Sequence, residues 1–228
     1  MIRRYLKESL SSEAYRSLRT NIQYSSIDKN LQIIVVTSSI PGEGKSTIAL
    51  NLAYSMSEMN KKVLLIDADL RRPTIHKKLN ISNLVGLTDG IIQKLELKDI
   101  VQKINDNLHV MTAGKIPPNP AEIVGSEAMT VLLNYFREIY DYIIVDTPPV
   151  LSVTDSQLLA LKADGTLLVV REGFVKAKLV RLAYEELEKV HVNIVGTVLN
   201  DSEEKSKISS EYYYKYEEIR PKGRNKRG

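Results

Sequence analysis

Residues 31–47 read LQIIVVTSSIPGEGKST, and this stretch decides the fold. Its first half is a continuous run of apolar, mostly β-branched residues, which is typical of a strand buried on both faces of a parallel sheet. Its second half is a turn with two glycines, which leads into a helical pattern at 46–59. Glycines let backbone N–H groups converge on an anion, and the start of a helix adds its positive dipole end. The order of strand, turn and helix therefore predicts a phosphate-binding loop.

The loop departs at one position from the pattern G-x-x-x-x-G-K-[ST], because Ser39 stands where the first glycine is expected. The rest of the pattern is intact, so we expect Lys45 to bridge the β- and γ-phosphates of a nucleoside triphosphate. The hydroxyl of Ser46 would ligate Mg²⁺, and Thr47 would touch the α-phosphate. The residues predicted to bind the nucleotide through this loop are Pro41, Gly42, Glu43, Gly44, Lys45, Ser46 and Thr47.

Strand and helix patterns alternate along the rest of the chain. Predicted strands are 31–39, 61–67, 108–114, 140–149, 164–172 and 192–200, and predicted helices are about 12–24, 46–59, 86–95, 121–139, 154–162 and 176–190. This alternation predicts an α/β fold with a mostly parallel central sheet and helices on both faces. Hydrophobic periodicity stops after about Asp201, so we expect one domain over 1–201 and a flexible tail over 202–228.

Acidic residues follow two of the predicted strands. Asp67 and Asp69 come after the second strand, and Asp146 follows the apolar run YIIV of the fourth. An aspartate after a strand is commonly a turn or helix-capping residue. Ligands of open α/β sheets bind at the carboxyl ends of the strands, where these acids would meet beside the phosphate loop. We therefore predict a metal–nucleotide site, with Mg²⁺ held by Ser46, Asp69 and Asp146.

Composition narrows the class of protein further. The chain of 228 residues has no cysteine, which excludes disulfides, a thiolate nucleophile and a cysteine zinc site. It has no apolar run of about 18 residues and no signal-peptide pattern, so we expect a cytoplasmic protein. The net charge is +4 and the last residues are rich in Lys and Arg, but no nucleic-acid-reading motif accompanies them. We expect no nucleic-acid partner.

Several separate elements resemble one family in sequence and in order. SSIPGEGKST, DADLRRP and IIVDTPP are similar to the Walker A, Walker A′ and Walker B motifs of the bacterial tyrosine kinases that accompany capsule and exopolysaccharide export. SSEAYRSLRTN resembles the family's E-x-x-R-x-x-R helix. The cluster at 212–216 resembles its C-terminal autophosphorylation tail. The chain looks like the stand-alone Gram-positive form, of the CpsD/CapB type, on a P-loop fold of the MinD/ParA-like deviant Walker class.

This resemblance implies an ATP- and Mg²⁺-dependent protein-tyrosine kinase that phosphorylates its own tail. The catalytic residues would be Lys45, Asp67, Asp69 and Asp146, with Asp67 as candidate base, although Asp67 and Asp69 could exchange roles. Arg71 would steer the acceptor or the phosphates, or it would simply pair with Asp69. Asn200 resembles an adenine-contacting asparagine, with a plain turn residue as the alternative. The predicted phosphoacceptors are Tyr212, Tyr213, Tyr214 and Tyr216.

The resemblance also implies partners. Glu13, Arg16 and Arg19 share a broad face of one predicted helix, and the family interpretation is a contact that builds a ring in which tails are phosphorylated in trans. Simple intrahelical ion pairing is the local alternative. A membrane-anchored activating adaptor would recruit the kinase to the inner face of the membrane, where it would phosphorylate other protein substrates and regulate polysaccharide synthesis and export.

Two other functions remain open. MinD/ParA-like ATPases, which act in positioning or assembly, share the expected fold and a similar pair of aspartates. Their loop carries a signature lysine five residues before the catalytic lysine, and Ile40 stands at that position here. A non-catalytic nucleotide-binding assembly module is the third possibility. The missing lysine and the tyrosine cluster favour the kinase.

Overall fold

A seven-stranded sheet forms the centre of the described part of the chain. The structure is a computed structural model, and it describes residues 11–25, 31–93 and 95–202. The strands are β1 (Ile33–Ser38), β2 (Val63–Asp67), β3 (Gln102–Lys103), β4 (Leu108–Met111), β5 (Tyr142–Asp146), β6 (Gly165–Arg171) and β7 (Ile194–Asn200). Their order is β3-β4-β2-β5-β1-β6-β7, and only the short edge strand β3 runs antiparallel to its neighbour.

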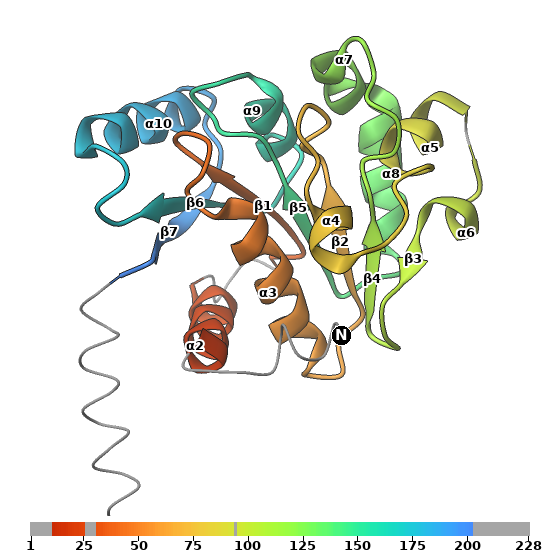
Figure 1. Cartoon of the computed structure of the whole chain (residues 1–228), viewed down its shortest axis with the longest axis horizontal. Coiled ribbons are helices and arrows are strands. Elements are labelled where there is room, and N and C mark those ends of the chain that lie inside the picture. Colours follow the sequence, from red (N-terminus) through yellow and green to blue (C-terminus); the bar gives the residue numbers. More distant parts are fainter. Residues whose placement is uncertain (1–10, 26–30, 94, 203–228) are drawn as a thin grey trace, which may run out of the picture.

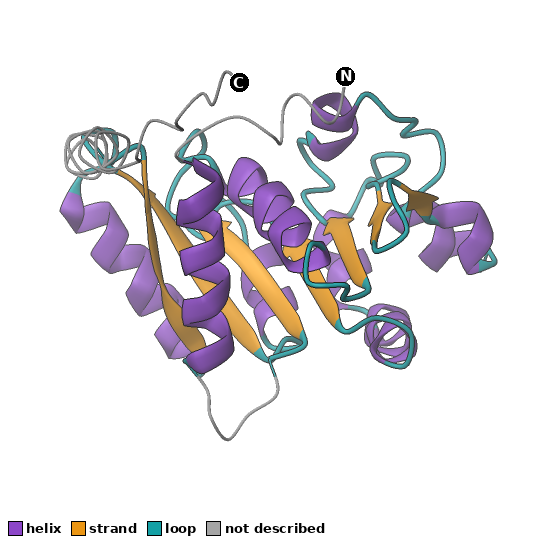
Figure 2. Ribbon diagram, turned by 90° about the horizontal axis from the view of Figure 1, so that it is seen from below, coloured by secondary structure: helices purple, strands orange, loops and turns teal. Residues whose placement is uncertain are grey.

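Helices cover both faces of the sheet (Figures 1 and 2). The helices are α2 (Ser11–Tyr24), α3 (Lys45–Ser57), α4 (Ile75–Leu79), α5 (Leu87–Gln93), α6 (Leu97–Ile100), α7 (Pro120–Gly125), α8 (Glu127–Arg137), α9 (Asp155–Ala160) and α10 (Ala177–Lys189). Side chains of α2, α3 and α4 join one hydrophobic core, and side chains of α5 to α10 pack on the opposite face. The predicted fold class is confirmed.

The central strands are buried on both faces because their side chains alternate between two apolar layers. Every residue of β1 and β2 is buried. Ile34 and Val36 of β1 contribute to the core beneath α3, whereas Ile33 and Val35 contribute to the core beneath α8. This explains why these strands appear in the sequence as unbroken apolar runs. No helix within the described ranges is long and apolar enough to cross a membrane.

The structure differs from the sequence prediction in the shorter elements. The single helix predicted over 121–139 is wrong, because the chain breaks at Ser126 into α7 and α8. Ser126 has extended backbone, with ψ 158°, and its hydroxyl accepts a hydrogen bond of 3.1 Å from the backbone N–H of Met129. It is therefore the N-cap of α8. The predicted tail, with its four tyrosines, lies from residue 203 onward outside the described residues.

Candidate nucleotide-binding and catalytic site

The phosphate loop joins β1 to α3 and requires its two glycines. Gly42 and Gly44 have φ values of 91° and 94°, in the left-handed region that residues with a Cβ rarely adopt. A Cβ on Gly44 would lie 2.2 Å from Nδ2 of Asn200. Gly44 is also the N-cap of α3, and its carbonyl accepts hydrogen bonds from the N–H groups of Thr47 and Ile48. The loop thus has the strand–turn–helix form that the sequence predicts.

The loop is fixed to the neighbouring strands by Glu43 and Asn200. The side chain of Glu43 is fully buried, where its two carboxylate oxygens accept hydrogen bonds from the N–H groups of Ile40, at 2.8 Å, and Arg171, at 3.2 Å. Nδ2 of Asn200 donates to the carbonyl oxygen of Glu43 at 2.9 Å. Both side chains therefore hold the loop in place, at the ends of β6 and β7. An adenine contact by Asn200 stays a prediction.

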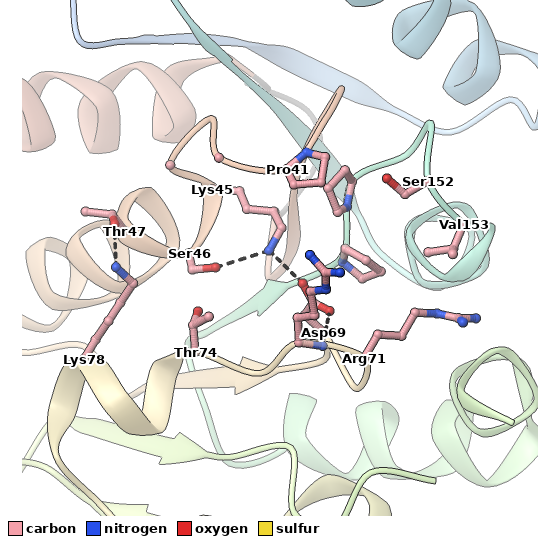
Figure 3. A pocket seen from close by; sticks show the side chains of 15 residues that line it. Pro41, Lys45, Ser46, Thr47, Asp69, Arg71, Thr74, Lys78, Ser152 and Val153 are labelled. Carbon is pink, nitrogen blue, oxygen red and sulfur yellow. Dashed lines mark hydrogen bonds and ion pairs between the residues drawn. The ribbon is translucent and has the colours of Figure 1, made fainter. Parts of the chain in front are cut away.

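Lys45 lies at the centre of a polar cluster (Figure 3). Its Nζ is 2.9 Å from Oδ2 of Asp69, 3.2 Å from Oγ of Ser46 and 3.7 Å from Oδ1 of Asp146. Burial by itself lowers the pKa of Lys45, but the carboxylates of Asp146 and Asp69 outweigh it and raise this pKa. The ammonium group is therefore charged at neutral pH and stands where phosphate oxygens would replace its present partners.

Asp67 and Asp146 are buried side by side at the carboxyl ends of β2 and β5, where they are paired in register. Both oxygens of Asp146 and Oδ1 of Asp67 lack a hydrogen-bond partner among the described residues. Burial, followed by the charge of Asp146, raises the pKa of Asp67 to about 8. Burial also raises the pKa of Asp146. Buried oxygens without partners are rare in proteins and point to a bound ion or ligand.

The other oxygen of Asp67 has a structural role. Oδ2 accepts hydrogen bonds of 3.0 Å from the N–H groups of Thr74 and Ile75, at the start of α4. The helix-capping alternative for this aspartate is thus correct for one of its two oxygens. These two bonds hold the carboxyl group in one orientation, and Oδ1 has no hydrogen-bond partner among the described residues.

The donor set around Lys45 fits Mg²⁺. No group of three or more His, Asp or Glu side chains in the described residues is arranged to hold a metal ion by itself. Mg²⁺ in phosphoryl-transfer sites uses one or two carboxylates, with substrate phosphates and water as its other ligands. Ser46, Asp69 and Asp146 all lie within 3.7 Å of Lys45 Nζ. They match that partial set, although their role as ligands stays a prediction.

Arg71 does not pair with Asp69, so that alternative is wrong. Its Nε and Nη2 donate to the two carboxylate oxygens of Asp155, at 3.0 and 3.1 Å. Asp155 is fully buried in the first turn of α9, 84 positions along the chain. Asp69 instead accepts a hydrogen bond from the backbone N–H of Arg72. The ion pair joins the loop after β2 to the start of α9, and no sequence pattern indicates it.

A cavity of about 500 Å³ opens between these loops, beside Lys45. Its lining residues from the phosphate loop are Pro41, Gly42, Gly44, Lys45, Ser46 and Thr47, joined by Asp69, Arg71, Arg72, Thr74, Lys78, Pro148, Pro149, Ser152 and Val153. The predicted site residues that line this cavity come from the ends of β1 and β2, whereas Glu43, Asp67, Asp146 and Asn200 are not among its lining residues. Arg72 belongs to the motif DADLRRP, whereas Lys78 was missed, because it belongs to no spacing that marks a nucleotide site.

The three charged residues predicted on the first helix have different partners in α2. Nη1 of Arg16 pairs with Glu13 at 3.1 Å, and both side chains are exposed. Arg19 turns to α3, where Nη1 donates to the carbonyl oxygen of Ser55 at 2.6 Å. Local ion pairing, the alternative to a subunit contact, therefore holds for Glu13 and Arg16. A role in assembly stays a prediction.

Comparisons with known proteins agree on one family. The family model described as ParA, NUBPL iron-transfer P-loop NTPase, matches residues 29–222. The tyrosine-protein kinase YwqD of Bacillus subtilis is 43% identical over 91% of this chain and 87% of its own length. The tyrosine-protein kinase CpsD of Streptococcus agalactiae is 34% identical over 91% of both chains.

Solved structures give the same result. The chimerical protein CapA2B2 has a TM-score of 0.83 and 36% identity, over 88% of this chain and 89% of that one. The kinase domain of the Escherichia coli tyrosine kinase ETK has a TM-score of 0.80 and 37% identity, over 83% of this chain and 74% of that one. McdA of Cyanthece, at 21% identity and a TM-score of 0.64, shows a shared fold alone.

Proposed function

This chain belongs to the bacterial tyrosine kinases of the YwqD and CpsD type, and from that premise we propose that it transfers the γ-phosphoryl group of ATP to tyrosines of its own C-terminal segment. The observation that carries the proposal is the buried pair Asp67 and Asp146. Three of their four carboxylate oxygens have no hydrogen-bond partner among the described residues, and Oδ1 of Asp146 is 3.7 Å from Nζ of Lys45. A phosphate loop alone supports nucleotide binding. The two acids supply what phosphoryl transfer needs in addition, a metal ligand and a base.

The residues divide the work as follows. The loop N–H groups and Lys45 hold the β- and γ-phosphates, while Ser46, Asp69 and Asp146 ligate Mg²⁺. Bound Mg²⁺ would neutralise phosphate charge and lower the pKa of the neighbouring carboxyl groups. The phenol oxygen attacks the γ-phosphorus, the bond to the β,γ-bridging oxygen breaks, and ADP leaves. The phenol proton passes to Oδ1 of Asp67, the oxygen of this carboxyl group that has no hydrogen-bond partner among the described residues.

The predicted acceptors are Tyr212, Tyr213, Tyr214 and Tyr216, and the enzyme would phosphorylate them in trans within a ring. Phosphate on several neighbouring tyrosines would add roughly −1.5 to −2 charges each, which would drive the tail out of a neighbour's site. The expected consequence is control of polysaccharide synthesis and export. The similarity to CpsD supports this assignment.

The direct test incubates the full chain with ATP and Mg²⁺ and maps phosphotyrosine by mass spectrometry. We expect phosphate on residues 212–216 of the wild type. Lys45→Met should lower its amount at least about 100-fold, because a main neutralising charge on the phosphates is lost. A variant with the four tyrosines changed to Phe controls for labelling elsewhere. Release of phosphate without phosphotyrosine would overturn the kinase and favour the ATPase alternative.

The ring is tested separately through α2. Arg16→Ala removes an exposed side chain whose local ion pair contributes only a few tenths of a kcal/mol, so the fold should be unaffected. We expect a smaller particle mass in light scattering with an unchanged thermal unfolding midpoint. Lys178→Ala, on the exposed surface of α10, serves as control. An unchanged mass in the Arg16 variant would eliminate the ring contact at this residue.

An activating adaptor at the membrane is the partner we propose. The similarity to the chimerical protein CapA2B2 supports it. Titration of the kinase with the cytoplasmic segment of a membrane protein encoded beside it should tighten ATP binding. Identical ATP affinity with and without the segment would argue for a self-sufficient enzyme.

A further inference from the structure

Lys78 lines the nucleotide cavity although it lies outside the three sequence motifs. Lys78 belongs to α4, and its Nζ donates a hydrogen bond of 2.9 Å to Oγ1 of Thr47, in the first turn of α3 (Figure 3). Lys45 approaches the cavity from the phosphate loop and points to Ser46 and Asp69. The two ammonium groups therefore lie beside successive residues of the same helix start.

The backbone of Lys78 is fixed on several sides. Ile75 and Leu79 of α4 are buried in the core beneath α3, with exposed fractions of 0% and 2%. Asp67 caps the start of α4, and the N–H of Lys78 donates to the carbonyl oxygen of Thr74. Lys78 is thus held on the cavity side of a short helix whose other face is anchored, and its exposed side chain reaches Thr47.

Lys78 has no carboxylate in direct contact among the described residues, although its charge acts at longer range on the buried Asp146. Lys78 forms no ion pair within the described ranges, whereas Lys45 lies against two carboxylates and Arg71 against Asp155. The hydroxyl of Thr47 gives it only a neutral hydrogen bond, which an anion would replace at a gain. A cation without an ion-pair partner among the described residues, lining a cavity of about 500 Å³, is therefore available to an anionic ligand.

We propose that Lys78 binds the α-phosphate of the nucleotide, an inference that rests on the nucleotide binding proposed above. In a phosphate loop the motif lysine reaches the β- and γ-phosphates, and the N–H groups cradle the α- and β-phosphates. Thr47 lies two residues beyond that lysine and is expected beside the α-phosphate. A cation bonded to its hydroxyl is placed at the phosphate that ATP and ADP share. Lys78 then holds substrate and product equally.

The test measures the dissociation constants of ATP and ADP by calorimetry with full-length Lys78→Ala. We expect both to rise by the same factor, roughly tenfold, as for loss of one charge-assisted hydrogen bond. Lys77→Ala is the matched control, because Lys77 is an exposed neighbour on α4 that does not line the cavity. It should change neither constant more than about twofold, and Lys78→Arg should restore most of the affinity.

The other outcomes overturn the inference in distinct ways. Unchanged affinities in Lys78→Ala would remove Lys78 from the nucleotide site. A loss for ATP without a loss for ADP would place the contact at the γ-phosphate. Unchanged nucleotide affinities with a raised KM for an acceptor peptide would assign Lys78 to the acceptor instead. Failure of the wild type to bind ATP would overturn the proposed function itself, which the unchanged-affinity outcome leaves standing.

Discussion

Asp146 and Asp164 lie at opposite ends of the same sheet, in opposite surroundings. Asp164, at the amino end of β6, accepts two hydrogen bonds from Arg137, at 2.8 and 2.7 Å, and two from the N–H groups of Gln32 and Ile33. Asp146, at the carboxyl end of β5, is fully buried and has no hydrogen-bond partner among the described residues. The carboxylate of Asp164 thus links three segments of the chain through hydrogen bonds. The carboxylate of Asp146 forms none within the described residues.

The same difference appears in their pKa values. Burial by itself raises the pKa of Asp164, but Arg137 and the backbone N–H of Ile33 outweigh it, so the pKa lies below its usual value. At Asp146 burial dominates over the attraction of Lys45, and the pKa is raised. A satisfied charge stabilises the fold, whereas an unsatisfied buried charge costs stability and is typical of functional sites. Asp164 at the amino end of the sheet stabilises the fold, whereas Asp146 at the carboxyl end has the features of the proposed site.

Exchanging each aspartate for Asn is the strongest way to break this comparison. Asp146→Asn should lower the rate of phosphotyrosine formation roughly 100-fold or more, because a metal-ligand charge is lost. Its free energy of unfolding should stay the same or rise by about 1 kcal/mol, since the cost of burying the Asp146 charge outweighs its attraction to Lys45 at 3.7 Å.

Asp164→Asn should do the reverse. It loses charge-assisted bonds to Arg137 and should lower the free energy of unfolding by about 1–3 kcal/mol, with a rate close to that of the wild type. Urea unfolding and a phosphotyrosine assay at a temperature where both variants are folded measure the two effects. Comparable losses of stability in both variants would contradict the division between the ends of the sheet.

A smaller effect concerns pH. The pKa of Asp67 is 3.8 in the unfolded reference and about 8 in the folded protein. Between these values the folded protein keeps a proton that the unfolded chain has released, so rising pH favours unfolding. The stability of the nucleotide-free wild type relative to Asp67→Asn should therefore fall as pH rises, by roughly 2 kcal/mol between pH 6 and pH 8. Parallel unfolding curves of the two proteins against pH would refute the raised pKa.

The elements that could be predicted from the sequence are those with strong local patterns. The loop at Gly44 and Lys45 is marked by a continuous motif, and buried strands such as β1 are marked by unbroken apolar runs. The helices α4 and α6 and the strand β3 span 5, 4 and 2 residues, too few for a period to show. The break at Ser126 is a local signal that was overlooked, because a serine three residues before Met129 can act as an N-cap.

The motif residues of the site could be predicted from the sequence. The residues that contact them from distant parts of the chain could not. Asp67, Asp69 and Asp146 follow strand ends, and parallel strands bring such ends together. The partner of Arg71 is 84 positions away, and Lys78 reaches the cavity only because a short helix packs under α3. Contacts of this kind depend on tertiary packing, which leaves no period or spacing in the sequence.

The hydrogen bond from Asn200 to the phosphate loop fixes the point from which the C-terminal segment begins. Because β7 ends there, and Asp201 is also held by Arg171 at 2.7 Å, the segment that carries the tyrosines starts at the edge of the nucleotide site. Tyr212 lies 11 residues beyond Asp201, so its Cα travels at most about 40 Å from that point, and Tyr216, 15 residues beyond, at most about 54 Å. In any assembly that works in trans, neighbouring active sites must be spaced within these radii. The length of this segment therefore sets an upper limit on the spacing of active sites in the proposed ring.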